Sequence, residues 1–311
     1  MIIPEKYIQE TKKKKTTLEM IKKDLAISYI LYEMSEHIKQ NKDSPFSKLI
    51  FKGGTLLSKT FLDYHRFSED LDFTFSDNKK LNKLTKSQKK KSIKKYIKKE
   101  FLPEIQKITD KYSFDFDSDE INQQGRNKYC PKKGPTKYTK FNVYLDKQDQ
   151  TPIKIEINFL EEPFEKSRKI KLKHLNPNSE SLVFPLKETS LYSYTPEEIL
   201  VEKIRAVLTR KNKIHERDIF DLFLLEKIGY NYQHQKSERI KQKIRQGIGF
   251  LEDRDKEIEK LKRIKEKFLV LEKKLFNEID TMSLCEYDLE EYKVFFKNLE
   301  KFLVELDFSD L

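Results

Sequence analysis

Cysteine is nearly absent from this chain of 311 residues, which contains only Cys130 and Cys285. Two cysteines so far apart, without paired neighbours, exclude a disulfide framework and a metal site built from thiolates. The sequence also lacks any run of about eighteen apolar residues, the length that a membrane-spanning helix needs. Its start, MIIPEKYIQETKKKK, lacks the apolar core of a signal peptide. These absences predict a soluble protein of the reducing cytoplasm, with no membrane partner.

Charge is what the chain has in excess. Charged residues make up 37% of the sequence, and the formal net charge is +12. A basic balance of this kind favours a polyanionic partner, nucleic acid first. A lysine-rich proteome produces the same composition, so charge alone leaves both interpretations open. Hydrophobic residues also make up 37%, which is enough for a core in one large domain or two ordinary ones.

Hydrophobic spacing predicts both helices and strands. Helical periodicity marks residues 17–40, and Thr195-Pro196 is a strong helix start because threonine caps and proline fits the first turn. Alternating or short apolar runs predict strands at 48–52, 69–75, 138–145 and 152–159. The lysine run at 79–100 has one apolar stripe, so its second half predicts a basic amphipathic helix that continues to about residue 109. Residues 236–306 are charged, poor in glycine and almost wholly helical in pattern.

The segment FKGGTLLSKTFLDYHRFSEDLDFTF, residues 51–75, carries the chemical signal. Gly53 and Gly54 follow a strand and precede a helix. Glycines let the backbone approach a ligand closely, and a helix start offers free N–H groups to an anion. Thr55 adds a hydroxyl group and Lys59 a positive charge, so the pattern predicts a triphosphate cradle. A glycine pair alone more often marks a tight turn.

Two carboxylates follow in the same segment. Asp70 and Asp72 are two apart on a predicted strand, so both side chains project from one face. Adjacent carboxylates resist joint ionisation, and a hard cation such as Mg²⁺ resolves that conflict. An exposed acidic edge strand is the alternative, which the preceding phosphate cradle disfavours. Glu156, on the strand KIEINF, is the best third ligand for a site with two metal ions, although it also fits an exposed strand position.

These motifs resemble those of a known family. KGG-T-L-x-S-K followed by R-F-S-E-D-L-D-F is similar to the first motif of the DNA-polymerase-beta-like nucleotidyltransferases. Within that superfamily it most resembles the AbiEii/AbiGii abortive-infection toxins of type IV toxin–antitoxin systems. The segment TPEEILVEKIRAVLTRKNKIHERDIFDLFLL is similar to the E-K-x-x-A…R-D-x-x-D-L segment of that family. The resemblance covers about residues 20–230, and its combined pattern is specific.

The resemblance implies a role for each matching residue. Asp70 and Asp72 would bind magnesium, and Glu156 would complete the metal site. Lys203 matches the functional lysine of the family and would contact the triphosphate, while Asp218 matches the aspartate of its arginine–aspartate pair. The residues that would hold the nucleotide phosphates share the first motif: Gly53, Gly54, Thr55, Lys59, Arg66 and Ser68.

A structural interpretation of the second motif stays open beside the functional one. Lys203 lies on a predicted helix near an apolar stripe, where a lysine needs a partner or a phosphate, or extends its ammonium group to solvent. Arg217, Asp218 and Asp221 can form an ion-pair network that clamps two helices. Asp221 suits that structural role better, and Asp218 the functional one.

We therefore expect an α+β fold. Residues 1–190 would form the nucleotidyltransferase core, a small mixed, mostly antiparallel sheet with flanking helices. Residues 191–311 would form a helical lobe that completes the active-site cleft. The expected reaction transfers NMP from an NTP substrate to an acceptor with the help of one or two Mg²⁺ ions.

The tRNA 3′ end is the favoured acceptor, because relatives of this type modify it and the 79–100 lysines would bind an RNA backbone. A cognate antitoxin is the other expected partner. Two alternatives stay open, a nucleotidyl- or phosphotransferase that acts on protein and a non-catalytic relative that binds RNA.

Overall fold

The computed structural model divides into two compact units, Met1–Tyr194 and Thr195–Leu311. A boundary after residue 190, as the sequence predicts, would cut through the last strand of the first unit, Thr189–Ser193. The structure describes residues 4–12, 16–116, 138–147, 151–159, 161–182, 184–210, 213–235, 237–248, 259, 261, 263–272 and 283–308.

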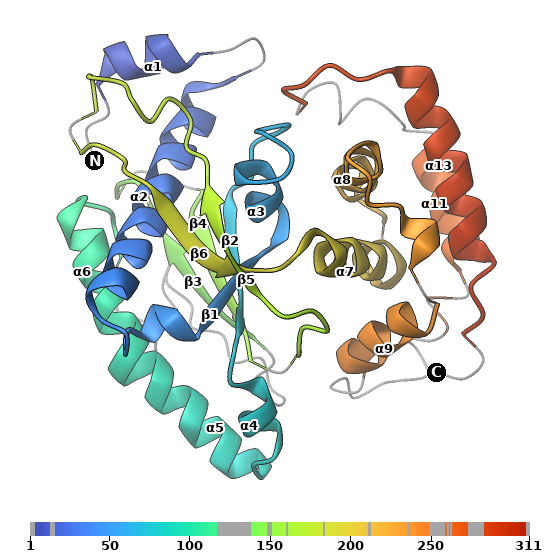
Figure 1. The fold of residues 1–311 in the computed structure, drawn as a ribbon, viewed down its shortest axis with the longest axis horizontal. Coiled ribbons are helices and arrows are strands. Elements are labelled where there is room, and N and C mark those ends of the chain that lie inside the picture. The colour runs from blue at the N-terminus through green and yellow to red at the C-terminus, as the bar shows by residue number, and fades with distance from the viewer. Residues whose placement is uncertain are drawn as a thin grey trace. The chain divides into compact units, whose positions relative to one another are not determined.

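The first unit is built on one six-stranded sheet with the strand order β3-β4-β2-β1-β6-β5 (Figure 1). Its strands are β1 (Leu49–Lys52), β2 (Asp70–Phe75), β3 (Tyr138–Val143), β4 (Ile153–Asn158), β5 (Arg168–Leu172) and β6 (Thr189–Ser193). The predicted α+β fold with a mixed sheet is confirmed, but the sheet is not mostly antiparallel, because two of its five strand pairs are parallel. β4 runs parallel to β2, and β6 runs parallel to β1. Parallel neighbours need long crossover connections, which a pattern of local strands does not reveal.

Helices pack around this sheet in the first unit (Figure 1). They are α1 (Glu5–Thr11), α2 (Leu18–Gln40), the 3₁₀-helix η1 (Pro45–Lys48), α3 (Gly53–Lys59), α4 (Asn78–Asn82), α5 (Lys86–Lys95), the π-helix η2 (Tyr96–Phe101) and α6 (Leu102–Lys111). Side chains fix two of the starts. The Thr17 hydroxyl accepts a hydrogen bond from the Met20 N–H, and Thr85 with Gln88 forms a reciprocal capping box. The predicted basic amphipathic helix is confirmed as the continuous run from α5 to α6.

Aromatic side chains form the core between the sheet and the α5–α6 run. The rings of Phe51 and Phe73, on adjacent strands, lie 5.3 Å apart between centroids, and Phe75 lies 4.7 Å from Tyr96 of η2. All four are buried. Cross-strand aromatic pairs of this kind stabilise strand pairing beyond their buried area. These contacts hold β1 and β2 side by side. The glycine pair follows directly after β1, and the two aspartates lie at the start of β2.

The second unit contains only helices among its described residues. They are α7 (Pro196–Thr209), α8 (Glu216–Lys227), the 3₁₀-helix η4 (Tyr232–His234), α9 (Ser237–Ile248), α11 (Ile264–Glu272) and α13 (Leu289–Val304). Thr195 caps α7 by accepting from the Glu198 N–H, as predicted, while the Glu198 carboxylate binds Lys243 of α9 at 2.6 Å. Part of the predicted 236–306 helical segment, including 249–258 and 273–282, lies outside the described residues. Within the described part of the chain, every helix is too short or too polar to cross a membrane.

Candidate active site

A glycine turn joins β1 to α3. Gly53 has φ of +84°, a conformation that costs glycine little and other residues more. A Cβ atom on Gly53 would overlap the Asp72 carboxylate, and one on Gly54 would lie 2.5 Å from Nη2 of Arg66. The two glycines therefore allow the backbone to pack directly against a carboxylate on one side and a guanidinium on the other. The first N–H groups of α3 lie at this turn and lack partners inside the helix.

Hydrogen bonds fix the loop before β2 onto α3. The Thr55 hydroxyl lies 2.9 Å from Oγ of Ser68 and also bonds the Asp70 carbonyl oxygen. The Ser58 hydroxyl donates to the Arg66 carbonyl oxygen at 2.8 Å. The structure thus brings the predicted nucleotide-binding residues Gly54, Thr55, Arg66 and Ser68 together around one turn.

Asp70, Asp72 and Glu156 lie on one face of the sheet and are called the carboxylate row. The strand register places Asp72 of β2 opposite Lys52 of β1 on one side and opposite Glu156 of β4 on the other. Glu156 is in turn opposite Lys140 of β3. Register partners share a face of the sheet, so the two carboxylates lie side by side with a lysine on each outer side. Asp70 lies on the same face as Asp72, because side chains alternate along a strand. Leu71 and Phe73, the neighbours of Asp72 in β2, point to the opposite face and are buried.

Lysines balance these carboxylates through partly exposed contacts. Lys140 Nζ lies 3.3 Å from Glu156 Oε2, and Lys154 Nζ lies 3.8 Å from Asp70 Oδ1. The side chains of both pairs are between 31% and 44% exposed. Ion pairs of this exposure contribute about 0–1 kcal/mol, so a ligand with a stronger charge can displace them.

The donor set of the row fits magnesium. Asp70, Asp72 and Glu156 offer only carboxylate oxygens, and Mg²⁺ takes one or two protein carboxylates together with phosphate oxygens and water. No group of three or more potential ligands is gathered for a metal ion among the described residues. The register therefore supports Asp72 with Glu156 as neighbours, and the role of Glu156 as a metal ligand stays a prediction.

Lys59 does not lie at the glycine turn. Its ammonium group is 1% exposed and bonds Asp24 at 2.8 Å, Ser28 at 2.9 Å and the Tyr64 hydroxyl at 2.7 Å. Burial lowers the pKa of Lys59, and Asp24 opposes that shift. The predicted contact of Lys59 with a nucleotide is therefore not supported, because this lysine turns into the core and joins α3 to α2. The position of Lys59 along the helix does not by itself show which face of α3 is buried.

Lys203 and Asp218 belong to a buried cluster in the second unit. Lys203 Nζ lies 2.9 Å from Asp218 Oδ1 and 2.6 Å from Asp221 Oδ2, and Arg210 Nε donates to Asp218 Oδ2 at 2.7 Å. Burial alone would raise the pKa of Asp218, but Lys203 and Arg210 outweigh burial and lower it. The cluster joins α7 to α8, so the geometry supports the structural interpretation. The roles of Lys203 and Asp218 toward a nucleotide stay predictions.

The sequence reasoning missed the lysines that neighbour the carboxylates. Lys154 stands two residues before Glu156 in KIEIN, so strand alternation alone places both on one face. That signal was available in the sequence. Lys140 is different, because only the pairing of β3 with β4 brings it opposite Glu156.

Comparison with known proteins assigns the chain to a family. The model of the family described as "Nucleotidyl transferase AbiEii toxin, Type IV TA system" matches residues 40–284. No curated protein matches the sequence. Among solved structures, the chain is similar to MenT4, the nucleotidyltransferase toxin Rv2826c from Mycobacterium tuberculosis H37Rv. That similarity covers 92% of this chain and 84% of MenT4, with 16% sequence identity and a TM-score of 0.48.

Proposed function

The chain belongs to the AbiEii nucleotidyl transferase toxins of type IV toxin–antitoxin systems, and from this premise we propose that it transfers NMP from an NTP to the 3′ end of tRNA. The observation that carries the proposal is the position of Asp72. This carboxylate contacts the glycine turn at Gly53 and stands in register with Glu156. A phosphate cradle and a pair of acidic oxygen ligands at one place are what nucleotidyl transfer needs. The family also suggests a cognate antitoxin as a partner.

The residues of the first unit would share the work as follows. The backbone N–H groups at Gly54 and Thr55 would bind phosphate oxygens, with the Arg66 guanidinium adding positive charge beside them. Asp70, Asp72 and Glu156 would hold Mg²⁺. Bound magnesium supplies charge neutralisation on the phosphates and orients them. The row would thus fix the α-phosphate for attack in line with its leaving group.

The proposed step balances without a covalent enzyme intermediate. An acceptor hydroxyl oxygen forms a bond to the α-phosphorus, and the bond from that phosphorus to the bridging oxygen breaks. Pyrophosphate leaves with the bonding electrons, and the hydroxyl proton passes to a carboxylate of the row. Positioning and electrostatic stabilisation carry such a reaction, so no residue becomes nucleotidylated.

A lysine surface supports RNA as the acceptor. Ile93, Tyr96 and Ile97 are buried against the first unit, so the remaining faces of α5 and η2 point to solvent. The exposed lysines of the segment 79–100, which also includes most of α4, are Lys79, Lys80, Lys83, Lys86, Lys90, Lys91, Lys94, Lys95, Lys98 and Lys99. A cluster of this density attracts a phosphate backbone without reading its sequence.

A transfer assay tests the proposal directly. The full chain is incubated with Mg²⁺, total RNA and each of the four labelled NTPs, and label in RNA and in protein is measured separately. We expect label on tRNA with the wild-type chain and none with the Asp70→Ala/Asp72→Ala variant. Equal transfer by the variant would refute the metal assignment. Label on protein would instead favour a protein acceptor, and its mass distinguishes an NMP unit from a phosphate.

A binding experiment tests the lysine surface. Charge reversal at Lys90 and Lys94 should weaken tRNA binding and reduce its dependence on salt, because fewer counterions are released. Lys301→Glu, at an exposed position of α13, is the matched control and should bind tRNA like the wild type. Equal binding by all three chains would remove this surface from the RNA path.

A further inference from the structure

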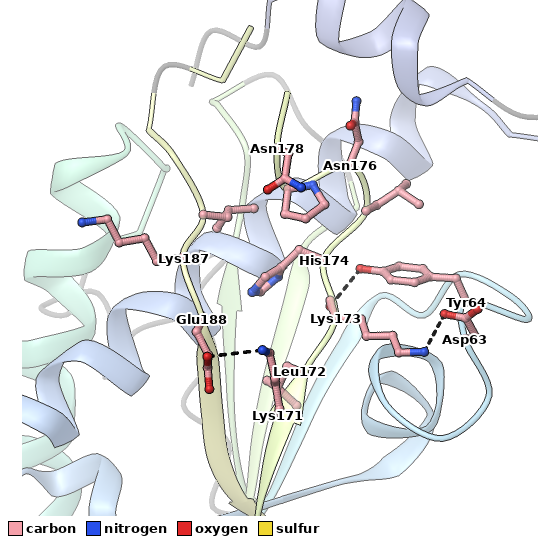
Figure 2. Close-up of a pocket in the computed structure, with 13 residues that line it drawn as sticks. Asp63, Tyr64, Lys171, Leu172, Lys173, His174, Asn176, Asn178, Lys187 and Glu188 are labelled. Atoms are coloured by element: carbon pink, nitrogen blue, oxygen red, sulfur yellow. Dashed lines mark hydrogen bonds and ion pairs between the residues drawn. The ribbon is translucent and has the colours of Figure 1, made fainter. Parts of the chain in front are cut away.

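The connection between β5 and β6 borders a cavity of about 680 Å³ in the first unit (Figure 2). Asp63 and Tyr64, from the loop after α3, line it from the other side. β6 begins at Thr189, four residues before Ser193, which is the register partner of Phe51 on the parallel strand β1. Four strand residues span about 13 Å, so the cavity lies near the start of β6, whereas the glycine turn lies near its end. The cavity is therefore separate from the carboxylate row.

His174 presents a hydrogen-bond acceptor in this cavity. The Thr189 hydroxyl has one proton, which it donates to the Lys187 carbonyl oxygen at 3.1 Å. Nε2 of His174 lies 2.7 Å from the Thr189 hydroxyl oxygen and is the donor in the tautomer that leaves the Thr189 proton directed at the Lys187 carbonyl oxygen. Burial and the nearby Lys59 charge lower the pKa of His174 to about 3, so its ring is neutral at pH 7. Nδ1 is consequently an acceptor, and it is buried with no hydrogen-bond partner among the residues that the structure describes.

Two lysine side chains offer positive charge at the edge of the cavity. Lys171 lies 3.2 Å from Glu188, and Lys173 lies 2.9 Å from Asp63 (Figure 2). Both pairs are more than half exposed, so each contributes little and can yield to a phosphate. Lys187 also lines the cavity, but its side chain extends away from His174 (Figure 2). A phosphorylated ligand would meet the ammonium groups of Lys171 and Lys173 here.

The remaining wall is apolar. Leu172, Leu175 and Leu186 are buried side chains that line the cavity, and Pro177 lies beside them. A volume of 680 Å³ falls within the range of roughly 300–1,000 Å³ that holds a small organic ligand. Inorganic phosphate would satisfy the lysines but would leave both the apolar wall and the His174 acceptor without contacts.

We propose that this cavity binds a nucleoside phosphate at a site distinct from the carboxylate row. The phosphate contacts Lys171 and Lys173, a hydroxyl or amino group of the nucleoside donates to Nδ1 of His174, and the base lies on the leucines. The same chemistry is offered by a free nucleotide and by an unpaired nucleotide of an RNA chain. Binding here requires no transfer activity, so its test is independent of the proposed reaction.

Calorimetry on the full chain tests this site. The chain carries Asp70→Asn and Asp72→Asn and the buffer contains EDTA, so that no nucleotide–metal complex binds at the carboxylate row. Each of the four NTPs, adenosine, pyrophosphate and a short single-stranded RNA are titrated separately. We expect one equivalent of an NTP or of the RNA to bind, and adenosine and pyrophosphate to bind more weakly. RNA binding without NTP binding identifies RNA as the source of the nucleotide only where Lys171→Glu weakens it, because the lysines at 79–99 also attract RNA. Absence of binding by every NTP and by the RNA overturns the proposal, and so does pyrophosphate binding as tight as that of the NTPs.

Two added substitutions locate the binding. Lys171→Glu, at an exposed position, should weaken the affinity by about tenfold or more, because it replaces a charge-assisted contact with repulsion. His174→Phe keeps a ring of similar size and removes the acceptor, so it should also weaken binding. Lys301→Glu is the charge-matched control and should change nothing. Unchanged affinity in Lys171→Glu overturns the proposal even where His174→Phe fails to fold.

Discussion

The carboxylate row and the Lys203 cluster are built from the same residue types, lysine and acidic residues on neighbouring elements. In the row, Asp70 and Glu156 are 39% and 31% exposed in their side chains, and each meets one lysine at 3.3 Å or more. In the cluster, Asp218 and Asp221 are almost fully buried, and both are within 3 Å of Lys203. Exposed, loosely paired carboxylates can exchange their partners for a ligand, whereas buried ones lose stability when a partner leaves. Solvent exposure therefore separates the two groups more sharply than sequence motif does.

Removal of Lys203 should produce the largest loss of stability. Lys203→Met leaves two buried carboxylates with one fewer cation, so we expect the free energy of unfolding to fall by about 3–5 kcal/mol. Lys227→Met is the matched control, because Lys227 pairs with Glu291 where both side chains are about half exposed. That control should lose less than about 1 kcal/mol in chemical denaturation. Equal losses in the two variants would contradict the difference between buried and exposed ion pairs. A Lys203→Met chain with normal stability but without transfer activity would instead favour a contact of Lys203 with the triphosphate.

Neutralising Asp72 should reduce transfer activity strongly and leave stability nearly unchanged. Asp72→Asn keeps the size of the side chain, so stability should stay within about 0.5 kcal/mol of the wild type. Transfer should fall by about 100- to 1,000-fold, because magnesium and the phosphates lose a ligand charge. Asp43→Asn, in an exposed loop, removes the same charge elsewhere and should leave the rate unchanged. A rate within a factor of three of the wild type, measured with labelled NTP, would place the chemistry elsewhere.

Two glycines with positive φ sharpen the same comparison. Gly53 and Gly229 have φ of +84° and +96°, so alanine at either position should cost about 1–2 kcal/mol of stability. Only at Gly53 would the new Cβ meet a side chain, Asp72, while nothing lies within 4 Å of the position at Gly229. We therefore expect Gly53→Ala to lose transfer activity beyond its stability loss, and Gly229→Ala to keep it. Thermal unfolding and the transfer rate, measured well below the unfolding temperature, separate the two effects.

The smallest expected effect is the pH dependence of the buried cluster. Because the folded-state pKa of Asp218 is lowered, its ion pairs stabilise the fold above the unfolded-state pKa near 4, and this contribution is lost as pH falls through the folded value. The difference in unfolding free energy between the wild type and Asp218→Asn should therefore be constant near neutral pH and shrink below about pH 4. A difference that grows on acidification would mean that the Asp218 pKa is raised.

Local sequence pattern accounts for features of both units. Asp70 and Asp72 share a face because strand residues alternate, and Thr195 begins α7 because its side chain binds the Glu198 N–H. Lys59 shows where local pattern fails. It stands in the first motif beside genuine neighbours of the glycine turn, but its side chain lies on the face of α3 that packs against α2. Whether a helix face is buried depends on an element more than twenty residues away in the chain.

The sequence by itself determined four of the six strands, the glycine turn, the shared face of the two aspartates and the family. Only the tertiary structure decided that Glu156 stands in register with Asp72, that Lys203 is held by two buried carboxylates, and that a cavity borders the connection between β5 and β6. The physical reason is that strand alternation and helix caps depend on residues a few positions apart. Parallel strand pairing, the burial of charges and the walls of a cavity depend on segments that only the folded chain brings together.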